Sequence, residues 1–187
     1  TGLPLGLLEG GTLTAIRTAS ATALATDVLA RADAARLLIV GTGEEAWYHA
    51  RALAHVRAFE SIGVWGRNPA HAAKLVARLA AAKLPHAPTV VAVDDLATAF
   101  AAADVACTVT SAKEPFVSGA WLPPGLHLNL VGSAIPTTAE VDVETVRRGK
   151  FFVDYRDAAL AQAGELRNAI AAGDRKSTRL NSSHGYI

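Results

Sequence analysis

The sequence predicts an α/β protein built on a doubly wound, parallel β-sheet. Short aliphatic segments alternate with helical segments along most of the chain, which is the order that places parallel strands between covering helices. The strand segments are apolar without alternation, as expected of a sheet that is buried on both faces. A glycine-rich turn joins the first of these strands to the helix after it. These three observations favour a doubly wound domain in the middle of the chain.

The first thirty residues precede this alternation. Glycines recur through residues 2–11, and residues 12–16 then form an apolar pattern, so we expect a turn followed by the end of a strand. The pattern becomes helical over residues 17–31, which are rich in small residues. A short linker begins at Asp33.

The alternation itself starts at Arg36. Its strands are expected at residues 36–41, 61–66, 89–93, 104–109, 126–131 and 150–154. Its helices are expected at residues 44–56, 69–82, about 95–103 and 142–148, and helical sequence returns from about Asp157. Pro69 suits the first turn of its helix, and Asp94 or Asp95 can cap the next one.

The composition of the chain restricts its partners. The chain has 187 residues, of which 51% are hydrophobic, so it can bury a sizeable core. The net charge of +1 provides no basic surface for nucleic acid, and no apolar segment approaches the roughly 20 residues of a membrane span. The one cysteine, Cys107, fits a reducing compartment, so we expect a cytoplasmic protein that binds neither nucleic acid nor membrane. The six histidines lack metal-ligand spacing, so no metal site is expected.

Both ends of the sequence suggest a piece of a longer protein. The chain contains no Met and starts at Thr1 in what reads as mid-domain sequence. Residues 175–187 lack alanine and are rich in serine. Such a segment is typical of translated sequencing-adapter read-through, although an ordinary polar tail is the alternative. The fold prediction therefore stops at residue 174.

The turn after the first strand carries the most specific motif. Residues 36–46 read as an aliphatic strand, a Gly-x-Gly-x-x-Ala turn and a helix start, which is the pattern of a Rossmann-type dinucleotide-binding unit. Gly41 permits the tight turn, Gly43 lets a pyrophosphate approach the backbone, and Ala46 lets the helix pack closely on the strand. The free N–H groups at the start of the helix would bind the phosphates.

Two acidic residues follow these glycines. Glu44 and Glu45 begin the helix, where the helix dipole favours acids. Their carboxylates would crowd a pyrophosphate, however. Binding therefore requires that the backbone N–H groups of Glu44 and Glu45 face the phosphates while both side chains point away.

The end of the second strand distinguishes between the two nicotinamide dinucleotides. An NAD site usually has Asp or Glu there, to bind the ribose 2′-hydroxyl. This chain has Trp65-Gly66-Arg67-Asn68, so no acid repels a 2′-phosphate, and Arg67 can pair with one. We therefore expect Arg67 and Asn68 to contact the cofactor, with NADP(H) preferred and NAD(H) as the other candidate. The alternative is that Arg67 is a solvated loop residue.

Further candidate contacts lie at the ends of the fourth and fifth strands. Thr110 and Ser111 follow the fourth strand, and Val131, Gly132 and Ser133 end and follow the fifth. Ligands of open α/β sheets bind at this carboxyl edge, so we expect these five residues to contact the cofactor. Gly132 would permit a close approach of the backbone, or it is a plain turn residue after a strand.

Three segments in this order resemble the ornithine cyclodeaminase/μ-crystallin family. They are residues 13–19, the turn 41–46 followed by His49, and residues 126–133 leading into Pro136 and Glu140. Members of this family use NAD(P)(H) on amino acids, cyclic imines or keto acids. They have a Rossmann domain in the middle of the chain and a second domain, built from both chain ends, that binds substrate and forms the dimer.

The resemblance implies a division of the chain. Residues 1–33 would end the first half of the substrate and dimerisation domain, and residues 34–155 would form the NAD(P)-binding Rossmann domain. Residues 156–174 would be the return helix towards the substrate domain, and residues 175–187 the artefactual tail. The chain would thus carry a Rossmann domain with remnants of a second domain, and the full-length protein would be a homodimer.

The resemblance also assigns roles to individual residues. Arg17 would bind the substrate carboxylate, for which its planar, permanently charged guanidinium is suited. The alternative is a surface arginine at a helix start, where the positive helix dipole is unfavourable for a cation. Thr18 would touch a cofactor phosphate, although capping of the helix explains this residue equally well. The nicotinamide would lie at the ends of the fourth and fifth strands.

One departure from the family pattern narrows the expected reaction. Cyclodeaminases carry an aspartate where this chain has Ala134, and alanine can neither transfer a proton nor pair with an ammonium group. We therefore expect reduction of a cyclic imino acid, such as Δ1-pyrroline-2-carboxylate, to the amino acid. The general acid would be a lysine outside this chain. The alternatives are ornithine cyclodeaminase or alanine dehydrogenase activity, or a non-catalytic protein that binds NADPH or a small ligand.

Overall fold

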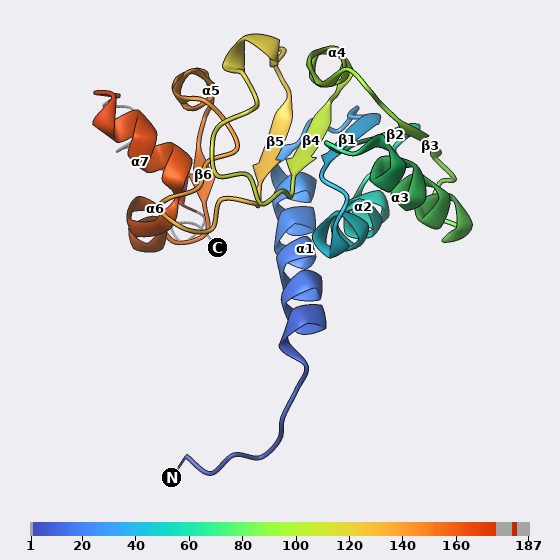
Figure 1. Cartoon of the computed structure of the whole chain (residues 1–187), viewed down its shortest axis with the longest axis horizontal. Coiled ribbons are helices and arrows are strands. Elements are labelled where there is room, and N and C mark those ends of the chain that lie inside the picture. Colours follow the sequence, from blue (N-terminus) through green and yellow to red (C-terminus); the bar gives the residue numbers. More distant parts are fainter. Residues whose placement is uncertain (1, 175–180, 183–187) are drawn as a thin grey trace.

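The computed structural model, which describes residues 2–174 and 181–182, has the expected doubly wound α/β architecture (Figure 1). Five parallel strands form one sheet in the order β3-β2-β1-β4-β5. They are β1 (Arg36–Val40), β2 (Ser61–Trp65), β3 (Thr89–Ala92), β4 (Val105–Thr108) and β5 (His127–Leu130). Each of these strands lies where the aliphatic segments predict it.

Seven α-helices and one 3-10 helix join and cover the described strands. They are α1 (Gly10–Leu29), α2 (Glu44–Val56), α3 (Pro69–Ala81), α4 (Leu96–Ala102), η1 (Gly119–Trp121), α5 (Val143–Arg148), α6 (Arg156–Gln162) and α7 (Gly164–Ala171). Side chains cap several of the predicted starts. Asn68, Asp95 and Asp142 each accept a hydrogen bond from a backbone N–H in the first turn of α3, α4 and α5.

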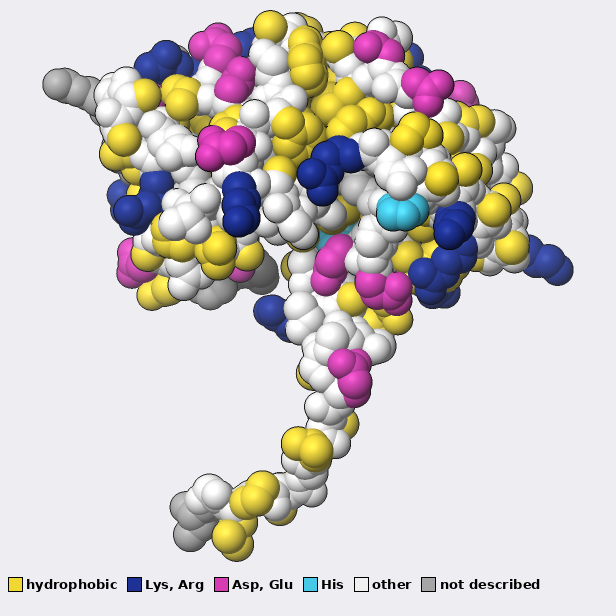
Figure 2. Space-filling model, in the orientation of Figure 1, with side chains coloured by type: hydrophobic (Ala, Val, Ile, Leu, Met, Phe, Trp, Pro, Cys, Tyr) yellow, Lys and Arg dark blue, Asp and Glu magenta, His cyan; other side chains and the backbone are white. Residues whose placement is uncertain are grey.

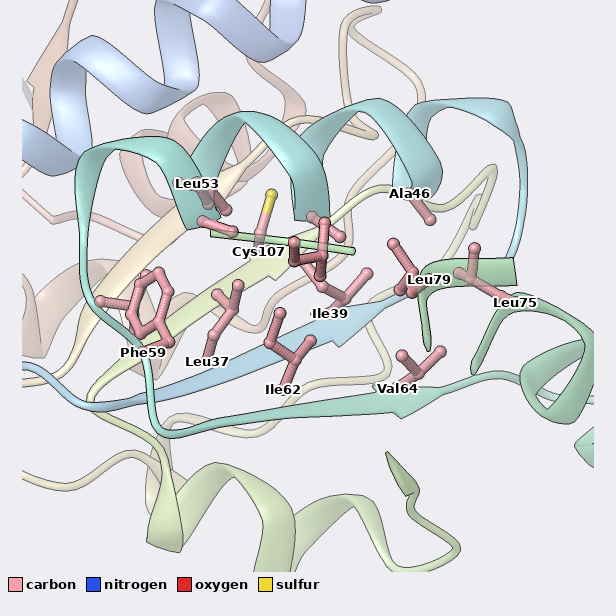
Figure 3. Close-up of a cluster of buried hydrophobic side chains, with 14 of the residues drawn as sticks. Leu37, Ile39, Ala46, Leu53, Phe59, Ile62, Val64, Leu75, Leu79 and Cys107 are labelled. Atoms are coloured by element: carbon pink, nitrogen blue, oxygen red, sulfur yellow. The ribbon is translucent and has the colours of Figure 1, made fainter. Parts of the chain in front are cut away.

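Both faces of the sheet are buried, which explains the lack of alternation in the strands. On one face, Leu37 and Ile39 of β1 point toward α2 together with Ile62 and Val64 of β2 (Figure 3). On the other face, Leu38 and Val40 of β1 pack against α4, α5 and α7. Cys107 lies in the first of these clusters, fully buried, and burial raises the pKa of its thiol well above the usual value. It is a core residue, as its position inside a strand predicts.

The expected strand over residues 12–16 is wrong, because α1 begins at Gly10 and includes all of them. Glu9 starts the helix, since its carboxylate accepts hydrogen bonds from Gly11 N–H at 2.6 Å and Thr12 N–H at 2.7 Å. A strand needs a neighbouring strand to pair with its backbone N–H and C=O groups, and no strand of the described chain pairs with these residues, whereas a helix pairs these groups within itself.

No described helix, including α1, is long and apolar enough to cross a membrane.

Helix α1 packs along α2, and polar contacts hold its C-terminal end to the sheet domain. The Arg57 guanidinium, just after α2, donates to the backbone carbonyls of Thr26, Asp27 and Ala30 and pairs with the Asp27 carboxylate at 2.8 Å. The Asn129 amide of β5 donates to the Thr26 hydroxyl at 3.0 Å. The N-terminal part of α1 and residues 2–9 project from the domain, with exposed apolar side chains (Figures 1 and 2).

The C-terminal region differs from the expectation in two ways. The sixth strand, β6 (Phe152–Val153), does not join the main sheet but pairs with β7 (Asn181–Ser182). The expected return helix is two helices, α6 and α7, which meet at Ala163. A side chain at Gly164 would clash with the Thr138 carbonyl, since its Cβ would lie 1.8 Å from that oxygen. Apart from residues 181–182, the tail assigned to read-through lies outside the described residues.

A buried carboxylate organises the amino edge of the sheet. Asp104 precedes β4 and accepts hydrogen bonds from the N–H groups of Ala35 and Arg36. It also pairs with the guanidinium groups of Arg31 at 2.9 Å and Arg36 at 3.0 Å. The hydrogen bonds from the Arg36 side chain are the main reason that the pKa of Asp104 falls to about 2. Asp104 thereby joins the end of the α1 segment to the starts of β1 and β4.

This geometry predicts a pH-dependent contribution to stability. The folded pKa of Asp104 lies below its unfolded value, so the ionised group stabilises the fold above about pH 4, and this stabilisation is lost as the pH falls towards 2. Asp104→Asn is expected to lower the free energy of unfolding at pH 7 by about 2 kcal/mol, measured by urea denaturation. The matched control is Asp33→Asn, because Asp33 is exposed and 3.8 Å from Arg31. Equal effects of the two substitutions would contradict this assignment.

Candidate functional site

The candidate site lies at the carboxyl edge of the sheet, where β1 has β2 on one side and β4 on the other. Gly41 leaves β1 with a φ of +134°, a conformation that L side chains rarely adopt. A Cβ at Gly41 would lie 2.6 Å from the Val109 carbonyl oxygen, and a Cβ at Gly66 would lie 2.4 Å from Thr42 Cγ2. The glycine turn therefore contacts the chain after β2 and after β4, which brings three predicted segments together.

Gly43, in contrast, has open space where a side chain would be. It is the N-cap of α2, with an ordinary extended conformation, and a Cβ there would meet no protein atom within 4 Å. No side chain caps the helix. The packing of the protein therefore does not require glycine at this position, and the exposed start of α2 is free to bind an anion.

The acidic side chains at the start of α2 lie beside different residues, although Oε2 of Glu45 has no hydrogen-bond partner in the described chain. Glu44 pairs with Arg78 of α3 at 3.3 Å, and the Arg78 guanidinium also lies 3.9 Å from the centre of the Trp47 ring. The Glu45 carboxylate lies 3.4 Å from Nδ1 of His49, one turn further into α2. Both carboxylates thus lie beside residues of α2 and α3.

His49 is fully buried in α2. Its Nδ1 lies 2.7 Å from the Glu45 carbonyl oxygen, and its Nε2 has no hydrogen-bond partner among the described residues. Burial lowers the pKa of His49, although the contacts with Glu45 oppose this effect. A neutral ring with its proton on Nδ1 donates to the Glu45 carbonyl and leaves the Nε2 lone pair without a partner among the described residues.

A cleft of about 190 Å³ adjoins the ends of β2 and β3. It is lined by Trp65, Gly66, Arg67, Pro69, Ala72, Ala92, Val93 and Asp94. The Arg67 side chain is exposed at this cleft, while the Asn68 side chain accepts a hydrogen bond from Ala70 N–H at 3.0 Å and so caps α3. Arg67 is thus available for a ligand, whereas the structure already gives Asn68 a local role.

The chain segments after β4 and β5 meet around one buried carboxylate. Glu140 is fully buried, and its Oε1 accepts hydrogen bonds from the Thr110 N–H at 2.8 Å and the Thr110 hydroxyl at 2.7 Å. Its Oε2 accepts from the Thr108 hydroxyl at 2.7 Å and the Gly132 N–H at 2.8 Å. Burial raises the pKa of Glu140, and these four hydrogen bonds oppose that shift.

The contacts of Glu140 change the interpretation of the residues beside it. A Cβ at Gly132 would lie 2.1 Å from the Thr110 carbonyl oxygen and 2.4 Å from Glu140 Oε1, so internal packing alone requires this glycine. Val131 packs against the core, and Ser133 is only 8% exposed. Of the five predicted contacts at this edge, Ser111 has the exposed side chain.

The sequence pattern did not identify Glu140 as a site residue. One local signal was present in the sequence, because the acid stands between the apolar residues Ala139 and Val141. An acid within such an apolar segment needs buried hydrogen-bond donors. Those donors lie 8 to 32 residues away in the chain, so their identity follows only from the fold.

Arg17 and Thr18 lie within α1, not at its start, because the helix begins at Gly10. The dipole at the start of α1 therefore does not act on Arg17, and Thr18 does not cap the helix. The Thr18 hydroxyl instead donates to the Thr14 carbonyl at 2.8 Å, and Arg17 is exposed.

The position of Arg17 and Thr18 along α1 can be compared with the start of α2, because the two helices pack together. The end of α1 contacts Arg57, just after α2, so the two helices end at the same edge of the sheet. Arg17 precedes the end of α1 by as many residues as Glu44 precedes the end of α2. At about 1.5 Å per residue, Arg17 and Thr18 lie level with the start of α2.

Ala134 lies on an exposed stretch of chain after β5. No group of three or more His, Cys, Asp or Glu side chains that could hold a metal ion occurs among residues 2–174 and 181–182. The described site therefore consists of an open helix start, an arginine-lined cleft and a carboxylate-centred edge.

Comparison with known proteins identifies relatives of this chain. Residues 1–181 match the family model described as ornithine cyclodeaminase/mu-crystallin family. The chain is 36% identical to a Δ1-pyrroline-2-carboxylate reductase of Colwellia psychrerythraea over 89% of this chain and 52% of that protein. It is 33% identical to the ketimine reductase mu-crystallin of Mus musculus over 88% of this chain and 50% of that protein.

A solved structure has the same fold over nearly the whole chain. It is the Thermococcus litoralis Δ1-pyrroline-2-carboxylate reductase in complex with NADH and L-proline, with a TM-score of 0.90 and 32% identity. The match covers 97% of this chain and 56% of that chain. The present chain thus spans about half the length of the relatives that it matches.

The two glycines of the turn provide a prediction about stability. Gly41→Ala is expected to lower the free energy of unfolding by about 2–4 kcal/mol, because the new Cβ meets a backbone oxygen at a strained φ. Gly43→Ala is the matched control and is expected to change it by less than about 1 kcal/mol. Urea denaturation of the chain without ligand measures both effects. Similar losses for the two variants would show that Gly43 is also a packing residue.

Proposed function

The chain belongs to the ornithine cyclodeaminase/mu-crystallin family, and we propose that it forms the nicotinamide-cofactor-binding half of an enzyme that reduces a cyclic imino acid. The observation that carries the proposal is the open start of α2, where Gly43 faces empty space and no side chain caps the helix. The names of the relatives support the reaction, since the Colwellia protein is a Δ1-pyrroline-2-carboxylate reductase and the mouse protein a ketimine reductase.

The residues at the glycine turn fit a dinucleotide. The backbone N–H groups of Gly43, Glu44 and Glu45 would bind the pyrophosphate, with the positive end of the α2 dipole behind them. The pairing of Glu44 with Arg78 and the contact of Glu45 with His49 draw the two carboxylates along the helices. We therefore expect Gly43→Ala to remain folded but to lose dinucleotide binding, because its methyl group would occupy the phosphate position.

We propose a preference for NADP(H) over NAD(H). Arg67 is exposed at the cleft beyond β2, and β2 itself ends in Trp65 and Gly66 without an acid. A guanidinium at this position would pair with a ribose 2′-phosphate. The acid that lines the cleft, Asp94, lies two residues after the end of β3. NAD(H) remains the alternative, since the Thermococcus relative was solved with NADH.

The proposed reaction assigns separate tasks to the residues of this chain. When bound, the reduced nicotinamide supplies a hydride for the imine carbon. Arg17, exposed on α1 and level with the glycine turn, would bind the substrate carboxylate and thereby orient the imine. Ser111 is the exposed residue at the β4 end and would contact the nicotinamide end, as would Thr110, Val131, Gly132 and Ser133 through atoms that the protein leaves free.

Ala134 favours reduction over the other candidate reactions. It is exposed after β5 and has no group that could accept a proton from a substrate amine. Ornithine cyclodeaminase and alanine dehydrogenase activities, which need such a step, are therefore the second choice. A protein that binds NADPH or another small ligand without turnover is the third.

We also propose that the whole protein is a homodimer. Several large apolar side chains of α1 are exposed, with Leu13 at 51%, Leu24 at 64% and Val28 at 70%. An exposed apolar face of this kind is typical of a surface that another protein segment covers. The substrate domain or the partner subunit would cover it.

The cofactor proposal predicts a change in specificity. Arg67→Asp is expected to weaken NADPH binding at least tenfold and to leave NADH binding within about threefold, because an acid repels the 2′-phosphate. Fluorescence titration of the folded chain with each nucleotide measures this. Lys74→Asp is the control, since it makes the same charge change on α3 outside the cleft lining. An unchanged NADPH-to-NADH ratio in Arg67→Asp would remove Arg67 from the site.

The reaction itself is tested with the protein that contains this chain, purified at its native length. Addition of Δ1-pyrroline-2-carboxylate is expected to cause oxidation of NADPH and formation of proline, and Arg17→Ala is expected to raise KM at least tenfold. Release of ammonia from ornithine would support a cyclodeaminase instead. Tight NADPH binding without turnover of any cyclic imine would favour the non-catalytic alternative.

A further inference from the structure

We propose that Glu140 is a positioning residue that sets the shape of the nicotinamide end of the site; this inference rests on the proposed cofactor function. Glu140 makes the four hydrogen bonds described above, to the end of β4, to the residue after Val109 and to the residue after Val131. It therefore joins the two segments expected to flank the nicotinamide, without itself being exposed.

The arrangement of donors is specific for a carboxylate. Each oxygen of Glu140 accepts one backbone N–H and one threonine hydroxyl, so all four partners donate. No Lys, Arg or His in the described part of the chain forms an ion pair with Glu140. The buried charge is thus compensated by neutral donors alone, which is a costly way merely to join two strands. Strands β4 and β5 are already joined by their backbone ladder.

The main chain of Glu140 is held as firmly as its side chain. Its N–H donates to Oε1 of Glu165 on α7 at 2.9 Å, and its carbonyl accepts from the N–H groups of Phe116 and Val117 at 3.1 and 3.0 Å. The carboxylate therefore has a fixed position relative to both segments. A movement of either segment breaks its bonds to Glu140, because Glu140 cannot follow it.

This arrangement determines which atoms a ligand can use. The N–H and hydroxyl of Thr110 and the N–H of Gly132 point inward to Glu140, so a nicotinamide ring cannot use them as donors. The same contacts bring the two segments so close that a Cβ at Gly132 would overlap the Thr110 carbonyl oxygen. We infer that Glu140 leaves this edge with carbonyl oxygens and the Ser111 side chain for the ligand, at a fixed separation.

Glutamine cannot replace Glu140 in either orientation. The two threonine hydroxyls can turn and become acceptors, but the N–H groups of Thr110 and Gly132 cannot. The amide nitrogen of a glutamine would face one of these two N–H groups whichever way it is placed. Glu140→Gln therefore loses the backbone contact to one of the two segments, at Thr110 or at Gly132.

The test compares a complete cofactor with one that lacks the nicotinamide. The folded chain is titrated with NADPH and with 2′-phospho-ADP-ribose, or with NADH and ADP-ribose if the wild type prefers NADH. Glu140→Gln is expected to weaken binding of the complete cofactor at least tenfold and of the truncated nucleotide less than twofold. The increase in NADPH fluorescence on binding, which reports on the ring environment, is expected to be lost.

Two further variants make the result decisive. Glu165→Gln is the matched control, because Glu165 is also a buried glutamate, but its oxygen only accepts the Glu140 N–H, which a glutamine can do. It is expected to bind both nucleotides like the wild type. Thr108→Val removes one of the four hydrogen bonds with little change of shape. It is expected to weaken the complete cofactor twofold to fivefold, and it decides the question if Glu140→Gln does not fold.

Other outcomes overturn the inference. Equal losses for both nucleotides in Glu140→Gln and Thr108→Val would assign Glu140 a purely structural role, while the proposed function would stand. Unchanged binding of both nucleotides in folded Glu140→Gln would also overturn it. If the wild type binds neither nucleotide, the proposed cofactor function fails, and this inference fails with it.

Discussion

The site depends on the buried carboxylate of Glu140, which holds the segments after β4 and β5 at a fixed distance. A carboxylate that accepts four hydrogen bonds tolerates little variation in the positions of its donors. Two of the donors are backbone N–H groups, so the constraint acts on the course of the main chain and not only on side chains. The glycine at position 132 follows from the same constraint, because a side chain would enter the space between the carboxylate and the Thr110 carbonyl.

The amino edge of the sheet is organised by a different kind of carboxylate. Asp104 also accepts two backbone N–H groups, but it pairs in addition with two half-exposed arginines. The pKa values of the two acids consequently shift in opposite directions: the Arg36 contacts lower that of Asp104, and burial raises that of Glu140. The cations that pair with Asp104 thus lie at the amino edge of the sheet, whereas the buried Glu140 at the carboxyl edge has neutral donors alone.

The glycine turn shows how an unfavourable sequence feature is accommodated. Two glutamates at the start of α2 suit the helix dipole but conflict with a bound pyrophosphate. The fold resolves the conflict by placing Arg78 of α3 beside Glu44 and over the Trp47 ring. The electrostatics of the turn therefore depend on a helix that begins 25 residues later in the chain. The occupied space at Gly41 makes that glycine a requirement of packing, whereas the open space at Gly43 shows that packing does not require glycine there.

The sequence alone was sufficient for the five strands of the main sheet, for α2, α3 and α5, and for the position of the glycine turn. These elements depend on local patterns, such as an aliphatic run, a capping Asp142 or a proline at the first turn of α3. The strand expected over residues 12–16 is wrong, since α1 includes these residues and no described strand pairs with them. Only the tertiary structure decided the contacts of Glu140, the direction of the Glu44 side chain and the position of Arg17 on α1 relative to the start of α2. Each of these depends on atoms that are distant in the chain, and the periodicity of a sequence carries no information about which distant donors surround a buried charge.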